Sequence, residues 1–256
     1  MLALAAVILQ GVLGGLRVTM LKDEIGIFHA CLAQAFLGLL VVIALVTSKL
    51  WRSVSNAMIE AKTFAPIKAI AVATTVVIYL QLALGATMRH QHRDLAILDF
   101  PTANGAWLPD TSAHALAKIN AWRDARALSD VTAFQIWLQM AHRFCAVLVL
   151  LGVLGFFMRV HGHLPASNAP RMLKRLSIWW LALVFVQLTL GAWTIWSNKA
   201  ADVATAHVAG GAIMLSFGVI ISAICWRILR SEWHGLPARG NFEHTGRMPV
   251  PQERIV

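Results

Sequence analysis

The sequence predicts an all-α polytopic membrane protein with about six transmembrane helices. Its composition supports this fold class, because 58% of the residues are hydrophobic and only 13% are charged, whereas a soluble domain carries about 25% charged residues. Six apolar stretches are each long enough to cross a bilayer as a helix, and none has the alternating pattern of a membrane β-barrel. They are residues 1–20, 25–48, 68–88, 132–158, 176–197 and 203–226.

The charged residues predict the orientation of these spans. Loops 49–67 and 159–175 contain seven basic residues and one acid, whereas the other loops between spans, of which 89–131 is the longest, contain eight of each. Because basic loops stay on the cytoplasmic side, we expect both termini in the cytoplasm and segment 89–131 outside, with a short surface helix over 113–127. The net charge of +10 therefore reports membrane orientation, and no nucleic-acid partner is expected.

A Gln-x-x-x-Gly motif occurs three times along the chain, each time near the outer end of an odd-numbered span. Each copy is followed by an outer loop and by a span with a histidine near its outer end. The glutamines are Gln10, Gln81 and Gln187, and the histidines are His29, His142 and His207. Repeats of this kind indicate a duplicated structural unit. Spans three to six would form one complete four-helix bundle, and spans one and two would form half of a second.

The repeat predicts three regions. Residues 1–67 are expected to form a partial N-terminal bundle of two spans and a cytoplasmic loop. Residues 68–230 are expected to form the complete C-terminal bundle, with the long outer loop 89–131, and residues 231–256 a cytoplasmic tail. A complete protein of this design would have two bundles of four helices. The chain is then expected to supply three quarters of it, and the first hairpin of the first bundle is missing.

His142 and His207 are the strongest candidates for chemistry, because they come from different hairpins of the same predicted bundle. Two imidazoles that face each other across a four-helix bundle can bind a haem iron from both sides. The small residues at 209–212 would let a macrocycle approach the helix, and Arg143 would contact a propionate. For a single intramembrane histidine, the alternative is a hydrogen bond that holds two helices together.

Other polar residues allow more than one interpretation. His29 has no partner helix in this design, so it is half of an incomplete site, a ligand for a bound substrate, or a packing residue. Arg89 and His90, at the outer end of the third span, are candidates for propionate contacts or for anchors in the membrane interface. We expect the glutamines and glycines of the repeated motif to serve helix packing.

The residues above resemble the haem A synthases, integral membrane enzymes that convert haem O to haem A for cytochrome oxidase. The resemblance rests on the repeated hairpins with outer histidines and on two further segments, Leu84-Gly-Ala-Thr-Met-Arg-His90 and Leu95-Ala-Ile-Leu-Asp-Phe-Pro101. It extends from Gln10 to about Arg230. The resemblance implies two four-helix bundles related by a pseudo-twofold axis, in the bacterial inner membrane.

The resemblance also implies roles for individual residues. His142 and His207 would be the axial ligands of a haem b, and His29 would be a ligand of the substrate haem. The enzyme would oxidise a porphyrin methyl group to formyl, with haem O synthase or cytochrome oxidase assembly factors as partners. Independently of the resemblance, the exposed hairpin without a partner favours a homo-oligomer. The family's Glu-x-x-x-His hairpin falls in the missing quarter, so an upstream start, a hairpin from another chain and a loss of full activity all fit. The alternatives to the enzyme are a non-catalytic b-haem protein for electron transfer or haem delivery, and a haem-free transporter or scaffold.

Overall fold

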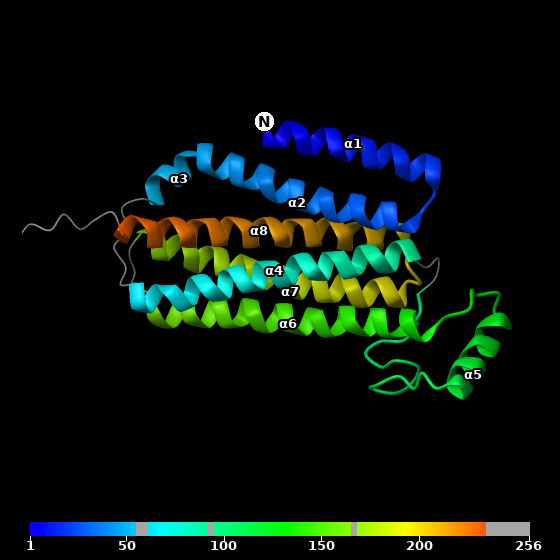
Figure 1. Ribbon diagram of the computed structural model, residues 1–256. Coiled ribbons are helices and arrows are strands. Elements are labelled where there is room, and N and C mark those ends of the chain that lie inside the picture. The colour runs from blue at the N-terminus through cyan, green and yellow to red at the C-terminus, as the bar shows by residue number, and fades with distance from the viewer. Residues whose placement is uncertain (55–60, 92–94, 165–167, 234–256) are drawn as a thin grey trace, which may run out of the picture.

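The computed structural model describes residues 1–54, 61–91, 95–164 and 168–233, which contain eight helices (Figure 1). Six of the helices in these ranges are long and apolar enough to cross a membrane, and this confirms the predicted fold class. In chain order the helices are α1 (Leu2–Met20), α2 (Asp23–Thr47), α3 (Lys49–Ser53), α4 (Ala61–Gln91), α5 (Ala113–Asp124), α6 (Ala133–His163), α7 (Asn168–Trp196) and α8 (Ala201–Trp233).

Local sequence explains where several helices begin and end. Helix α6 begins with a capping box, in which the Thr132 side chain accepts from the N–H of Gln135 while the Gln135 side chain accepts from the N–H of Thr132. Helix α1 ends at Leu21, whose left-handed backbone returns its N–H to the carbonyl of Arg17. These caps satisfy terminal backbone groups at the outer ends of the helices, where the chain leaves the apolar layer.

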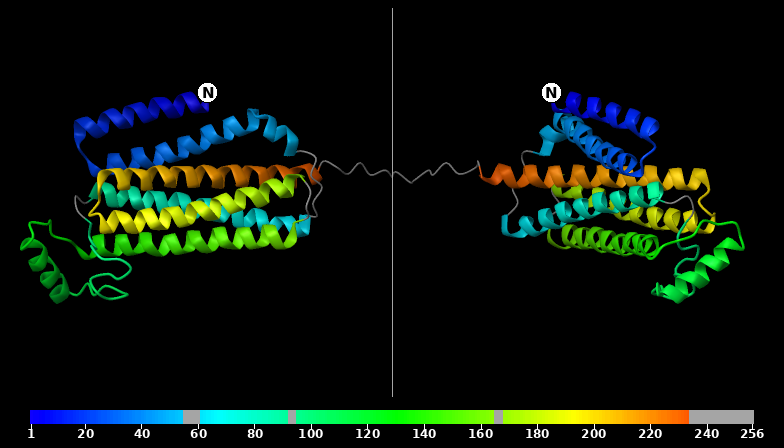
Figure 2. Two further views of the ribbon diagram at one scale, coloured as in Figure 1. Left: turned by 180° about the vertical axis from the view of Figure 1, so that it is seen from behind. Right: turned by 45° about the vertical axis from the view of Figure 1, so that its right-hand side comes forward.

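Helices α4, α6, α7 and α8 form a closed four-helix bundle, in which each helix packs against two of the others. Helix α2 lies against α4 and α8 on one side of this bundle, and α1 packs on α2 (Figures 1 and 2). None of the residues of α1 is buried. The described residues therefore form one four-helix bundle with the α1–α2 hairpin against its side.

The bundle core is mostly aliphatic, and Trp180 is the one tryptophan buried in it among the residues that the structure describes. Trp180 is fully buried, its ring lies edge-on to Phe156 at 5.7 Å, and its Nε1 donates to the carbonyl of Met214 at 3.2 Å. Gly218 permits this packing, because a Cβ at this position would lie 2.7 Å from Thr75 Oγ1 and 3.1 Å from the Trp180 ring. Small residues let helix backbones approach closely in membranes, where packing stabilises the association of helices.

The outer segment 95–131 folds into a small cap over the outer end of α6 (Figure 1). The predicted surface helix is present as α5, and Ile97, Ala103 and Val131 form a separate apolar cluster with α6. The buried Gln139 amide ties this cap to the bundle: Ile97 N–H donates to Oε1 and Nε2 donates to the Ile97 carbonyl, both at 2.9 Å.

We predict that Gln139→Leu releases the 95–105 segment from the bundle. The substitution leaves the Ile97 N–H and carbonyl without their partner in a buried position, at a cost of about 1–3 kcal/mol for each unsatisfied group. Hydrogen–deuterium exchange should accelerate at Ile97 and in the residues up to 105, but not in α7. Unchanged exchange at Ile97 would contradict this role of Gln139.

Candidate functional site: a histidine pair inside the bundle

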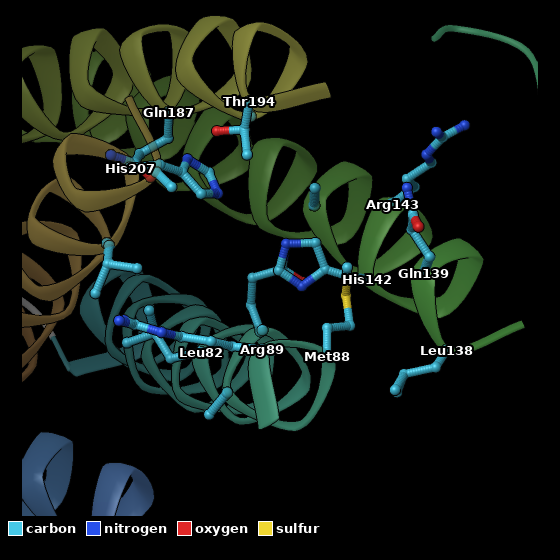
Figure 3. Close-up of a pocket in the computed structure, with 18 of the residues that line it drawn as sticks. Leu82, Met88, Arg89, Leu138, Gln139, His142, Arg143, Gln187, Thr194 and His207 are labelled. Atoms are coloured by element: carbon cyan, nitrogen blue, oxygen red, sulfur yellow. The ribbon is translucent and has the colours of Figure 1, made fainter. Parts of the chain in front are cut away.

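His142 on α6 and His207 on α8 face each other across the interior of the bundle (Figure 3). Their ring centroids lie 6.5 Å apart, and the ring planes are inclined by 71°. One metal ion held by both rings at the usual metal–nitrogen distance of about 2 Å would place the centroids about 6 Å apart. The structure therefore brings together the two histidines that the sequence paired, at a separation suited to one shared iron.

A cavity of about 910 Å³ contains this pair and reaches the outer surface. Cofactor sites commonly measure about 300–1,000 Å³ and are mostly apolar. Leu82, Met140 and Met214 contribute apolar walls, and Gly85 and Gly191 lie in the wall beside the histidines. The volume and the lining are suited to a large, mostly apolar molecule that carries polar groups at one edge.

The Gln-x-x-x-Gly motif forms the same structure in all three hairpins, and its glycine supports the histidine ring. A Cβ at Gly85 would lie 3.3 Å from Cε1 of His142, and one at Gly191 would lie 3.3 Å from Cε1 of His207. The equivalent distance from Gly14 to Cε1 of His29 is 3.4 Å. Each motif glycine therefore lies under the histidine ring of the helix that follows it.

The motif glutamine bonds to the same histidine in each case. Gln10 donates to the His29 carbonyl at 3.2 Å, and Gln81 donates to His142 Nε2 at 3.1 Å. Gln187, in the amide orientation that satisfies both of its ends, donates to His207 Nδ1 and to the His207 carbonyl, each at 3.0 Å. The prediction that the glutamines bond to a neighbouring helix is therefore confirmed. The sequence did not lead us to the histidine as the partner, although the recurring spacing from glutamine to histidine was the signal for it.

The ring nitrogens of His142 are unequally satisfied. Because the Gln81 amide nitrogen can only donate, His142 Nε2 accepts, and the neutral ring carries its proton on Nδ1. His142 Nδ1 is buried and has no hydrogen-bond partner in the part of the chain described. A buried polar atom without a partner is costly, so the site fits a bound group that changes the bonding of this ring.

The small residues after His207 do not all have the role that the sequence predicted for them. The prediction that they leave room for a macrocycle is wrong for Gly210, because the Gln187 amide fills the position of a Cβ there. A Cβ at Gly211 would lie 2.7 Å from Leu82, although Gly211 still lines the cavity. These two glycines admit side chains from α7 and α4 to the backbone of α8.

The polar rim of the cavity is cationic. No Asp or Glu in the described ranges lines the cavity, whereas five basic or potentially basic side chains near its outer end do: Arg17, Arg89, His90, Arg143 and Lys199. Such a rim favours carboxylate groups on a bound molecule. Arg89 and His90 therefore lie where propionate contacts were predicted, and the sequence analysis did not single out Arg17.

Arg143 lines the cavity but bonds to the outer loop. Its guanidinium donates to the carbonyls of Asp99 at 2.7 Å, Thr102 at 2.9 Å and Pro101 at 3.4 Å. Trp196 Nε1 donates to the Phe100 carbonyl at 3.4 Å from the other side. Arg143 thus anchors the loop over the cavity, and its contact with a propionate stays a prediction.

His29 and His90 lie at the side of the bundle that carries the α1–α2 hairpin. The His90 ring packs on Gly26 of α2, where a Cβ would lie 2.7 Å from Nδ1. His29 is held by α1 through Gln10 and Gly14, and its Nδ1 is buried with no hydrogen-bond partner among the described residues. His92 of the same outer run lies outside the described residues.

The chemistry of the site follows from its ligand set. Within the described ranges, no group of three or more His, Cys, Asp or Glu side chains could hold a bare metal ion. Two opposed imidazoles supply only two ligands, so an iron between them needs a macrocycle for its other positions. The site is therefore suited to a bis-histidine haem with its carboxylates toward the cationic outer rim.

The fold and the site define a polytopic membrane protein with a half-buried, haem-compatible histidine pair. The family model described as cytochrome oxidase assembly protein matches residues 1–219. The chain therefore belongs to the COX15-CtaA family, to which the haem A synthases belong, and this membership supports a role in cytochrome oxidase assembly. A search of curated proteins found no match.

The outer loop should loosen at low pH through Asp99. Its carboxylate accepts from Thr102 Oγ1, Asn104 N–H and Gly105 N–H at 2.7, 2.7 and 3.0 Å. Burial raises the pKa of Asp99, but these hydrogen bonds outweigh burial and hold the pKa below its ordinary value. Because the folded pKa is lowered, the stabilisation is present above the unfolded pKa of about 3.9 and is lost as the pH falls through the folded value.

We predict that exchange protection factors at residues 104 and 105 are constant from about pH 7 to pH 5 and decrease below about pH 4. Protection factors remove the intrinsic pH dependence of amide exchange, so they isolate the effect of the carboxylate. Asp99→Asn should lower protection at all pH values and abolish its pH dependence. An unaltered pH profile in this variant would show that Asp99 does not hold the loop.

Proposed function

We propose that the chain is a haem A synthase-type oxidoreductase of the bacterial inner membrane, with both termini in the cytoplasm. It would hold a haem b between His142 and His207 and act in the conversion of haem O to haem A. The observation that carries this proposal is the opposed pair of imidazoles, 6.5 Å apart inside a four-helix bundle, in a chain of the cytochrome oxidase assembly family.

The residues of the cavity fit a haem b in three ways. His142 and His207 would supply its nitrogen ligands, and the cationic side chains at the outer end, Arg89 and His90 among them, would suit its propionates. The apolar walls exclude water from the macrocycle. When bound, haem b supplies one-electron transfer, and the protein supplies its orientation and the polarity of its surroundings.

The substrate haem would lie on the side of the α1–α2 hairpin, with His29 as a ligand. Gln10 and Gly14 of the preceding span contact His29, as Gln187 and Gly191 contact His207, although Gln10 bonds only to the backbone carbonyl of His29. The cavity also reaches α2, where Ala30, Cys31 and Gln34 contribute to its lining. Oxidation of a methyl group to formyl with water as the oxygen source releases four electrons and four protons, so the reaction needs an external electron acceptor. A haem b held by His142 and His207 would pass the electrons to that acceptor one at a time. Haem O synthase and oxidase assembly factors are the partners that this reaction would require.

A non-catalytic b-haem protein is the second candidate function. No described carboxylate lines the cavity, so the described residues supply no acidic side chain as a proton acceptor for methyl oxidation. A b-haem carrier or electron-transfer protein needs only the ligands and the cationic rim. The two functions share the His142–His207 site and differ in whether haem O or haem A is bound as well.

We predict that the purified protein has the reduced-minus-oxidised visible spectrum of a low-spin, six-coordinate b-type haem. His142→Ala and His207→Ala should each abolish it, because one axial ligand is lost. His161→Ala is the matched control, since His161 lies on the same helix as His142 at the exposed inner end, and it should retain the spectrum. If the purified wild-type protein contained no haem after expression with adequate haem supply, both proposed functions would be wrong.

We further predict that haem extracts separate the enzyme from the carrier. The enzyme yields haem O or haem A beside haem b, and His29→Ala keeps the b-type spectrum while it lowers the haem A recovered. Haem b alone from the wild-type protein would favour the carrier. Loss of the b-type spectrum in His29→Ala would show that the two haem positions are assigned to the wrong hairpins.

A further inference from the structure

The Gln187 amide joins three groups of helix α8 at once. It donates to Nδ1 and to the backbone carbonyl of His207, and it accepts from the N–H of Gly211 at 3.2 Å. The carbonyl of residue 207 and the N–H of residue 211 are partners in the helical ladder, so the amide binds the same turn that carries the imidazole. Figure 3 shows Gln187 beside His207 on the α7 side.

We propose that Gln187 is a positioning residue that sets the ring orientation and the basicity of His207 as an iron ligand. The inference rests on the proposed haem site and extends it to the side chain that tunes one ligand. An imidazole on a metal almost always bonds through its other ring nitrogen to a neighbouring group, which fixes the ring and alters its strength as a ligand. Gln187 occupies that position at His207 Nδ1.

The geometry gives Gln187 control over rotation of the ring. Contact with Nδ1 restrains the ring from one edge. Gly191, one helical turn further along α7, lies beside Cε1, since a Cβ built at Gly191 would be 3.3 Å from that atom. Because the same amide is bonded to the backbone of α8, the ring, its helix and α7 are held as one unit. The amide carries both a donor and an acceptor, so it can serve Nδ1 in either protonation state.

Gly210 is what allows the amide to reach α8. The three nearest atoms to a Cβ built at Gly210 all belong to the Gln187 side chain, and one end of the amide overlaps that position. An alanine at 210 would therefore displace the amide. Gly210 and Gln187 form a matched pair, which makes their coupling measurable without any bound haem.

The other two copies of the motif lack this combination. Gln81 contacts Nε2 of His142 and leaves Nδ1 without a partner among the described residues. Gln10 contacts only the backbone carbonyl of His29, and His29 Nδ1 has no hydrogen-bond partner in the described ranges. The His142–His207 pair is therefore asymmetric, and the tuned ligand is His207.

The first experiment measures the midpoint potential and the haem retention of Gln187→Leu in the full-length protein in detergent. When iron binds Nε2, Nδ1 carries the ring proton, and the Gln187 amide can accept that proton only through its oxygen. Loss of this acceptor makes the imidazole less basic, which destabilises ferric iron, so the potential should rise. Haem retention should weaken about 10–100-fold, as for other residues that bond to a metal ligand. Gln10→Leu, the same change in the other hairpin, should leave both quantities of the b-type haem at wild-type values. A wild-type potential and wild-type retention in Gln187→Leu would overturn the proposal.

The second experiment remains informative even if Gln187→Leu does not bind haem. Thermal unfolding of the haem-free protein is compared for Gly210→Ala, Gln187→Ala and the double variant. Gly210→Ala should lower the Tm in the wild-type background and have little effect in the Gln187→Ala background, where the space is free. An equal decrease in Tm in both backgrounds would overturn the proposed pairing of Gly210 with Gln187. Absence of haem from the wild-type protein would instead contradict the proposed function and leave this coupling as a separate result.

Discussion

The absence of water in the apolar layer is the constraint on which the rest of this structure depends. A polar side chain inside a transmembrane bundle must find its partner on a neighbouring helix, because an unsatisfied buried group costs about 1–3 kcal/mol. The glutamine of each Gln-x-x-x-Gly motif supplies a partner from the preceding odd-numbered span: Gln81 and Gln187 bond to the rings of His142 and His207, and Gln10 bonds to the backbone carbonyl of His29. The glycine of the same motif brings that span close enough for contact with the ring.

The energies indicate that these contacts matter more for geometry than for stability. Hydrogen bonds between helices in membranes contribute about 0.6 kcal/mol on average, whereas helix packing over the whole bundle involves many side chains. A misplaced axial ligand, by contrast, affects the site directly. The unit of motif glutamine, motif glycine and following histidine occurs twice in this bundle, once with His142 and once with His207. It therefore places two imidazoles at a separation that one iron can bridge.

Much of the fold was predictable because the bilayer imposes a length and a composition on each span. The predicted spans 1–20 and 132–158 correspond to α1 and α6, and the helix expected over 113–127 is α5. Helix α4 begins seven residues before the predicted start at 68, because Lys62 and Lys68 interrupt the apolar pattern but not the helix. The apolar pattern locates the part of a helix that lies in the bilayer core, but it does not locate the helix ends that extend beyond the core.

The site was predictable in its ligands but not in its supporting contacts. The repeat paired His142 with His207, since both lie at matched depth in one bundle. It could not show that Gln187 reaches the backbone of α8, because that contact depends on the missing Cβ of Gly210 in a partner helix. Nor could it show that Arg143 holds the carbonyls of Asp99 and Thr102, because the path of the outer loop is set by tertiary packing.

The central claim is that one iron is held between His142 and His207 with the ring planes inclined by 71°. The measurement that tests it most directly is the low-temperature EPR spectrum of the ferric protein. Nearly perpendicular imidazole planes give a highly anisotropic low-spin signal, and this is the predicted result. A rhombic low-spin signal would mean that the planes are nearly parallel. A high-spin signal would mean that one of the two histidines is not a ligand, and it would contradict the account.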